Sequence, residues 1–131
     1  ALFSGAFLCV AMFVLYPTCI DFRPAAEGTG VFRALCRLIY AHDAPVNVFP
    51  SLHCYEALVL HLVAFRAPLR APKALRLASF ALVVLICLST LLIKQHSAAD
   101  LIAGCALAVA AHLLTTYLFS KRRSHHDHTT V

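Results

Sequence analysis

Two histidines and one aspartate have the spacing of a catalytic group. His53 lies in the segment NVFPSLHC, residues 47–54, near the start of a long apolar run. His96 and Asp100 are four residues apart, so on a helix they share one face. A carboxylate there can accept one ring N–H and leave the other ring nitrogen as a nucleophile or base. A lone histidine is ordinarily structural, but an unpartnered Asp100 inside an apolar run would be costly, which favours the pair.

The start of the apolar run at residue 51 indicates an anion-binding helix end. A proline followed by Ser51 is typical of a helix start, and Ser51 or Asn47 is the expected cap. The first backbone N–H groups of this helix, beginning with Leu52, are suited to bind an anion beside His53. Arg23, in the preceding polar segment, has a guanidinium that matches phosphate geometry, although an exposed loop arginine is usually only solvated.

Three further polar side chains lie inside the apolar runs. Glu56 is one turn beyond His53 and is placed to tune it or to bind a substrate hydroxyl. His61 and His112 are more simply explained as core histidines with a local hydrogen-bond partner. Ionisable groups at membrane depth are costly, so each is also a candidate functional residue.

The composition of the chain is that of a membrane protein. Of 131 residues, 61% are hydrophobic and only 13% are charged, whereas soluble domains carry about 25% charged residues. The apolar runs cover residues 1–16, 51–65, 73–93 and 98–119, which predicts four transmembrane helices. We expect the first to be the end of a helix whose beginning is missing, so that the chain is a fragment.

The polar segment 17–50 and the basic residues predict the orientation. Residues 31–40 place apolar side chains on one helical face and two arginines on another, as in a short interfacial helix. Basic residues gather from the end of the second run to the first turn of the third and again after the fourth, at Arg66, Arg70, Lys73, Arg76, Lys121, Arg122 and Arg123. Because short cytoplasmic loops hold most Lys and Arg, we expect both groups on the cytoplasmic side of the membrane. The segment 17–50 and the break before residue 98 then face outward, which places His53 and His96 together on the outer side. The net charge of +5 therefore reflects topology, and nucleic-acid binding is not expected.

The six cysteines show no metal-ligand spacing, and most lie in or at the ends of apolar runs as small core residues. Cys19 and Cys36 share the outer segment, where a disulfide between them is a minor alternative.

The order and spacing of the polar residues resemble the membrane phosphatidic acid phosphatase type 2 superfamily, over roughly residues 16–104. Its motifs are K-x6-R-P, P-S-G-H and S-R-x5-H-x3-D. The matching residues are Arg23 and Pro24 for the first, Pro50, Ser51, Leu52 and His53 for the second, and Ser89, His96 and Asp100 for the third. The joint occurrence of three motifs in one order is specific.

The chain departs from these motifs at three positions. Tyr16 stands where the family has Lys, and Thr90 stands where it has the second phosphate-binding Arg. Leu52 replaces Gly, as in the PSLH variant of the branch that is similar to inositol phosphorylceramide synthases. If residues 90–94 are helical, Lys94 lies one turn beyond Thr90 and leans back toward it, so that Lys94 would restore the missing charge.

The resemblance implies phosphoryl transfer through a phosphohistidine. His96 would attack phosphorus, Asp100 would orient its ring, and His53 would protonate the leaving oxygen. The phosphate oxygens would be held by Arg23, Ser51, Leu52, Ser89 and Lys94. The scheme requires no metal or cofactor.

We therefore expect an all-α polytopic membrane bundle at residues 1–120 and a disordered basic, His-rich cytoplasmic tail at 121–131. The resemblance implies that this bundle is the C-terminal part of a six-helix protein. The expected substrate is a lipid phosphate or related ester, in a bacterial plasma membrane with the site facing outward. Hydrolysis is the first expectation. Transfer to an alcohol such as inositol is favoured by the PSLH variant, and a non-catalytic transporter or scaffold by the missing Lys and Arg.

Overall fold

The computed structural model describes residues 2–19, 21, 24–25, 27–44, 46–65 and 71–128, without the side chains of 123–128. This part of the chain is all helical, as expected, and forms no β-strand. Its helices are α1 (Leu2–Leu15), α2 (Val31–His42), α3 (Leu52–Ala64), α4 (Lys73–Leu92) and α5 (Ala98–His128). Each lies where the sequence pattern predicts a helix, because each apolar run is bounded by polar residues, Pro or Gly.

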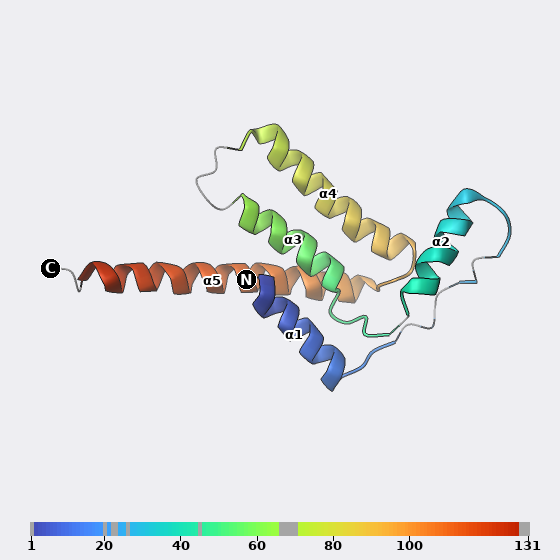
Figure 1. Ribbon diagram of the computed structural model, residues 1–131, viewed down its shortest axis with the longest axis horizontal. Helices are drawn as coiled ribbons and strands as arrows, with labels where there is room; N and C mark the ends of the chain where they lie inside the picture. The colour runs from blue at the N-terminus through green and yellow to red at the C-terminus, as the bar shows by residue number, and fades with distance from the viewer. Residues whose placement is uncertain are drawn as a thin grey trace.

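Helix α3 is the centre of the bundle and packs against α1, α4 and α5. Figure 1 shows α3 and α4 as an antiparallel pair, with α5 running beside α3 and extending beyond it. The end of α1, the start of α3, the end of α4 and the start of α5 all lie toward the end where α2 is found (Figure 1). Segments far apart in sequence are therefore brought together there.

A close contact between α1 and α3 fixes one side of the bundle. The side chain of Tyr55 is fully buried with Cys9, Val59 and Ala108, and its hydroxyl donates to the Leu2 carbonyl at 3.1 Å. A Cβ at Gly5 would overlap the Tyr55 ring. Glycine at position 5 is thus what lets the tyrosine lie flat against the backbone of α1.

Two helices are long and apolar enough to cross a membrane. These are α4 and the part of α5 up to Arg122, and only 17% and 11% of their apolar windows are buried inside the structure. A core helix of a soluble protein would be mostly covered by protein, so these exposed apolar faces favour a lipid environment. Helices α1 and α3 have 14 and 13 residues, which gives each about 20 Å against a bilayer core of about 30 Å. Four membrane spans are thus not established.

Two further expectations concern the ends of the molecule. Helix α2 has no buried residue, and Phe32 and Val31 are exposed, which leaves its predicted interfacial position a prediction. Helix α5 continues through His128, and the expected disorder of the tail at 121–131 stays a prediction. Lys and Arg are good helix formers, and extending an existing helix adds one hydrogen bond for each residue fixed.

Candidate active site

The loop before α3 is held by the loop that follows α1. The Thr18 hydroxyl accepts from the backbone N–H groups of Val48 and Phe49, each at 3.1 Å. The Thr18 carbonyl accepts from the N–H of Asn47. Asn47 adopts φ 58°, a left-handed conformation that asparagine tolerates better than most residues. These bonds fix the approach of the chain to Ser51 and thereby the direction in which α3 begins.

Ser51 caps α3 and ties it to α5. Its hydroxyl accepts from the Cys54 N–H at 3.4 Å, which is the capping role expected for Ser51. Its own N–H donates to the Asp100 carbonyl at 3.0 Å. A Cβ at Gly104, one turn further along α5, would overlap the Ser51 carbonyl oxygen. Glycine at 104 therefore permits the start of α3 to lie directly on the first turns of α5.

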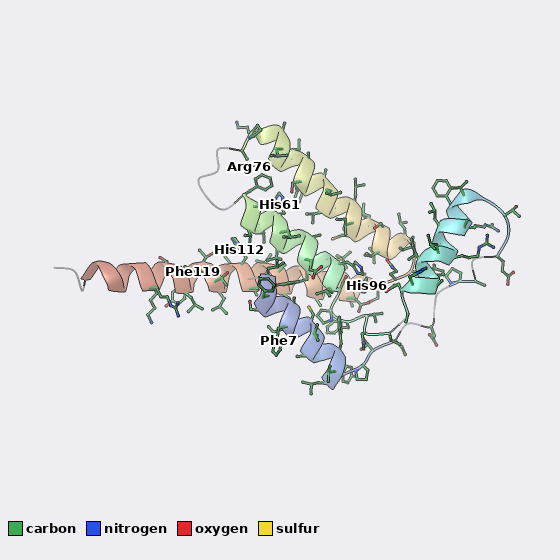
Figure 2. The ribbon with its side chains drawn as sticks, viewed as in Figure 1. Phe7, His61, Arg76, His96, His112 and Phe119 are labelled. Carbon is green, nitrogen blue, oxygen red and sulfur yellow. The ribbon has the colours of Figure 1, made fainter. Side chains whose placement is uncertain are left out.

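His53 and His96 meet at this junction. Nδ1 of His53 lies 3.4 Å from Nε2 of His96, and the two rings are arranged edge to face with centroids 5.7 Å apart. His96 is buried, whereas more than a third of His53 is exposed. Figure 2 shows His96 at the end of the bundle near α2, and His61 with Arg76 at the opposite end of the α3–α4 pair.

Asp100 has a second, structural role that sequence reasoning missed, although Ser97 followed three residues later by Asp100 before an apolar run is the pattern of a capping box. Its Oδ2 accepts from the Ser97 N–H at 2.7 Å, and its own N–H donates to the Ser97 hydroxyl at 3.3 Å. This reciprocal arrangement is a capping box at the start of α5. Oδ2 is also 3.8 Å from Nδ1 of His96, which is an ion-pair distance but too long for a hydrogen bond. Nδ1 of His96 makes no hydrogen bond with the described residues.

The turn between α4 and α5 carries His96 into position. The Lys94 N–H bonds to the Leu91 carbonyl, and the Gln95 N–H bonds to the Thr90 carbonyl. Together with φ 57° at Lys94, this is a Schellman motif, in which the left-handed position is usually glycine. Helix α4 ends at Leu92, so the helical geometry that would lean Lys94 back toward Thr90 is not present. Lys94 is exposed, and its phosphate-binding role stays a prediction.

Lys94→Gly and Lys94→Arg separate the two roles of this lysine. Glycine removes a left-handed conformation that costs other residues about 1–2 kcal/mol, partly offset by its greater freedom when unfolded. Lys94→Gly should therefore unfold at the same or a higher temperature. If the ammonium binds phosphate, kcat/KM should fall about 10- to 100-fold in Lys94→Gly and be largely kept in Lys94→Arg. Unchanged kcat/KM in a folded Lys94→Gly protein would restrict the role of Lys94 to the turn.

A cavity of about 290 Å³ opens beside the two imidazoles. Its polar lining includes Asp43, His53, Gln95 and His96, and its apolar lining includes Phe13, Val46, Val48 and Leu52. Nε2 of Gln95 donates to Oδ2 of Asp43 at 2.9 Å, and Gln95 is itself buried. Sequence reasoning missed both residues. The signal was there, since acids are rare in this chain and Asp43 shortly precedes the His53 motif.

The surroundings of His96 favour its neutral form. Burial of the ring is the largest cause that lowers the pKa of His96 below its ordinary value, and the nearby His53 lowers it further. Asp100, the Val48 backbone and Asp43 oppose this shift. The net result is an imidazole that remains unprotonated, and so able to act as a nucleophile, below the pH at which an ordinary histidine gains its proton.

Other predicted residues lie away from the imidazole pair. The Ser89 hydroxyl is exposed and donates to the Ile86 carbonyl of its own helix, and within the described residues no hydrogen bond joins it to His53 or His96. The Thr90 hydroxyl is buried against Cys54 and donates to the Cys87 carbonyl. Position 90 therefore contributes to the α3–α4 contact. Arg23 lies outside the described residues.

The remaining polar groups named in the sequence analysis lie in different surroundings. Nδ1 of His61 lies 2.9 Å from the Ser79 hydroxyl, the local partner expected of a core histidine. Nδ1 of His112 is buried without a hydrogen-bond partner among the described residues. Glu56 is exposed on α3. All six cysteines are free, so no disulfide joins Cys19 to Cys36.

The fold and the site together indicate one class of protein. The helices carry exposed apolar faces, and a buried imidazole with a nearby carboxylate contacts a second imidazole from another helix beside a cavity. This arrangement is suited to covalent catalysis by histidine with a second histidine as acid and base.

Comparison with known proteins agrees with this class. A family profile described as the PAP2 superfamily matches residues 2–114, and the chain belongs to that superfamily. The superfamily includes phosphatases and phosphotransferases, which supports an enzyme that transfers phosphoryl groups. Neither the search of curated proteins nor the search of solved structures gave a match, and the branch resembling inositol phosphorylceramide synthases is not established.

Proposed function

We propose that this protein transfers the phosphoryl group of a lipid phosphate to water through a phosphohistidine on His96. The observation that carries the proposal is the 3.4 Å contact between Nδ1 of His53 and Nε2 of His96. The contact joins residues 43 positions apart, at the edge of a cavity large enough for a phosphate group. Two imidazoles in contact supply a nucleophile and a proton donor for the same phosphorus atom.

The reaction proceeds in two steps. In the first, Nε2 of neutral His96 attacks phosphorus, the bond from phosphorus to the lipid oxygen breaks, and protonated His53 gives its proton to that oxygen. In the second, a water molecule attacks the phosphohistidine, neutral His53 takes the water proton, and inorganic phosphate leaves with His96 restored. Asp100 stabilises the positive charge that develops on His96, and hydrogen bonds to it tighten when substrate is bound.

The substrate must separate the two rings. A reactive nitrogen lies about 3–3.5 Å from the atom it attacks, and a general acid lies about 2.6–3.2 Å from the oxygen it protonates. A phosphorus atom and its leaving oxygen therefore do not fit between nitrogens 3.4 Å apart. His53 is the ring that moves, because it is exposed, whereas His96 is buried and follows the hydrogen-bonded turn of residues 90–96.

The phosphate oxygens would be held by groups at the start of α3 and in the adjoining loops. Leu52 lines the cavity at the first turn of α3, where backbone N–H groups favour an anion. Ser51, Ser89 and Arg23 are the further candidates named by the motifs, and Lys94 is the candidate that would replace the Arg missing at position 90. This set would spread its positive charge over the equatorial oxygens of the transferred group.

A lipid substrate follows from the membrane location that we propose for the site. Helices α1 and α3 would complete the bundle with α4 and α5, and the imidazole pair would lie at the membrane face opposite Arg76 and the basic end of α5. By the distribution of basic residues, that face is the outer one. Head groups of lipids lie at this depth.

The test uses phosphatidic acid labelled with ³²P and the purified protein in detergent micelles, with a chelator present. The expected results are release of labelled inorganic phosphate and an acid-labile label on the protein, as for a phosphohistidine. Label that moves only to an added alcohol would instead indicate a head-group phosphotransferase. No product of either kind from any phosphate ester would support the non-catalytic alternative.

The acid side of the pH profile follows from the lowered pKa of His96. Only the neutral ring attacks, so kcat/KM should fall as the pH drops through a pKa below the ordinary value of about 6.5. Asp100→Asn removes a carboxylate that favours the imidazolium, so its profile should shift to still lower pH. Substrate ionisation is common to both proteins and cancels in this comparison. A shift toward higher pH would contradict the assignment of His96.

A further inference from the structure

The cavity beside the imidazole pair contains a carboxylate that the reaction described above does not use. Asp43 lines this cavity with His53, Gln95 and His96. It is half-buried and lies close enough to His96 to act on its charge. A carboxylate repels a phosphate, so the proposed reaction gives Asp43 no place among the phosphate ligands.

Asp43 is held in a defined position. Its Oδ2 accepts from Nε2 of Gln95 at 2.9 Å. Gln95 is buried, and its backbone N–H is fixed by the Thr90 carbonyl in the turn before His96. The carboxylate is therefore attached to the same rigid turn as the proposed nucleophile, which gives it a fixed position relative to the reacting group.

An ionised carboxylate only accepts hydrogen bonds and has about four acceptor sites, so it can hold a substrate donor in addition to the protein groups around it. A quaternary ammonium group is usually bound by a cage of aromatic rings. Apart from the two imidazoles, Phe13 is the one aromatic residue among the described lining residues. A lipid phosphate or an acceptor alcohol can offer a carboxylate a primary ammonium group or a hydroxyl group, and in glycerol and polyol esters the donor beside the reacting phosphate is a hydroxyl group.

We propose that Asp43, positioned by Gln95, forms a subsite that binds a hydroxyl group of the alcohol portion of the substrate. This inference rests on the proposed phosphoryl transfer. The hydroxyl would lie on the group that leaves from phosphorus or, in the reverse direction, on the alcohol that accepts it. The subsite thus selects hydroxyl-bearing head groups over otherwise identical ones.

The test compares 1-acylglycerol 3-phosphate with its 2-deoxy analogue, which differ by one hydroxyl group. The measured quantity is the ratio of their kcat/KM values in wild type, Asp43→Ala, Asp43→Asn and the control Asp21→Asn. Asp21 is an exposed acid that does not line the cavity. Wild type should prefer the hydroxyl substrate at least about tenfold, the effect of one hydrogen bond to a charged group. The preference should disappear in Asp43→Ala, fall to a few-fold in Asp43→Asn and persist in Asp21→Asn.

The ratio is unaffected by a merely structural role, because damage to the turn or to His96 slows both substrates alike. An active wild type with the same ratio as Asp43→Ala would overturn the subsite and leave the proposed function intact. A wild-type protein inactive on both esters would overturn the proposed function and the subsite together. An Asp43-dependent preference for the 2-amino analogue over the hydroxyl substrate would overturn the assignment to hydroxyl groups.

Discussion

Replacing His96 with alanine is expected to lower the turnover of a lipid phosphate by roughly 10⁵- to 10⁶-fold, the scale on which an enzyme loses activity with its covalent nucleophile. No other described group at the cavity occupies its position opposite His53. The variant should retain its fold, because the backbone N–H of residue 96 still bonds to the Thr90 carbonyl. The accompanying measurement is labelling of the protein by ³²P-substrate, which should disappear entirely.

His53→Ala should behave differently, because its role depends on the leaving group. With a lipid phosphate, loss of the general acid should cost about 10²- to 10⁴-fold. With 4-nitrophenyl phosphate, whose leaving group departs without a proton, the loss in the first step should be much smaller. The phosphoprotein should then accumulate, since the second step lacks its base.

His42→Ala is the matched control for both variants. His42 is an exposed imidazole whose Nδ1 lies 2.8 Å from the Leu38 carbonyl of its own helix. Its loss should change neither turnover nor labelling. If the first step of His53→Ala, measured as the rate of protein labelling or of leaving-group release in one turnover, were slowed equally with both leaving groups, His53 would not be the proton donor. A labelled His96→Ala protein would place the covalent intermediate elsewhere.

The positions of the helices were predictable because hydrophobic runs and breaking residues are local signals. The run from Lys73 to Leu92 and the cap at Ser51 needed only neighbouring residues. Whether α1 and α3 cross the membrane was not predictable in the same way, because helices of 14 and 13 residues are shorter than an ordinary membrane span. The continuation of α5 through residues 121–128 is consistent with helix propagation, in which each added residue forms one further hydrogen bond.

The site was predictable only in part, for a similar reason. The spacing of His96 and Asp100 indicated a pair on one helix. His96 lies instead in the connection between α4 and α5, which begins with a Schellman turn, and only Asp100 lies in α5. The Asp100 carboxylate accepts a hydrogen bond from the Ser97 N–H. Asp43 and Gln95 are 52 positions apart, so their contact depends on tertiary packing that no local pattern encodes. The same holds for the contact between Gly104 and the Ser51 backbone.

Gly104→Ala is expected to lower activity about 100-fold while leaving the protein folded. The added Cβ would overlap the Ser51 carbonyl oxygen, a backbone atom that cannot rotate away. The start of α3 must then move away from α5, which weakens the bond from the Ser51 N–H to the Asp100 carbonyl. A displacement of about 1 Å at a catalytic group can cost about 10²-fold in rate, and overpacking of this kind costs about 1–3 kcal/mol in stability.

The control is Ala106→Val on the same helix, where the side chain is exposed. It should leave activity unchanged. Because Gly104→Ala alters the position of His53 relative to His96 and removes no reacting group, its labelling by ³²P-substrate should be slowed but not abolished. Full activity in a folded Gly104→Ala protein would show that α3 and α5 can separate without disturbing the two imidazoles. The rate would then not depend on the Ser51–Gly104 contact, and the geometry of the site would be set by the turn before His96 alone.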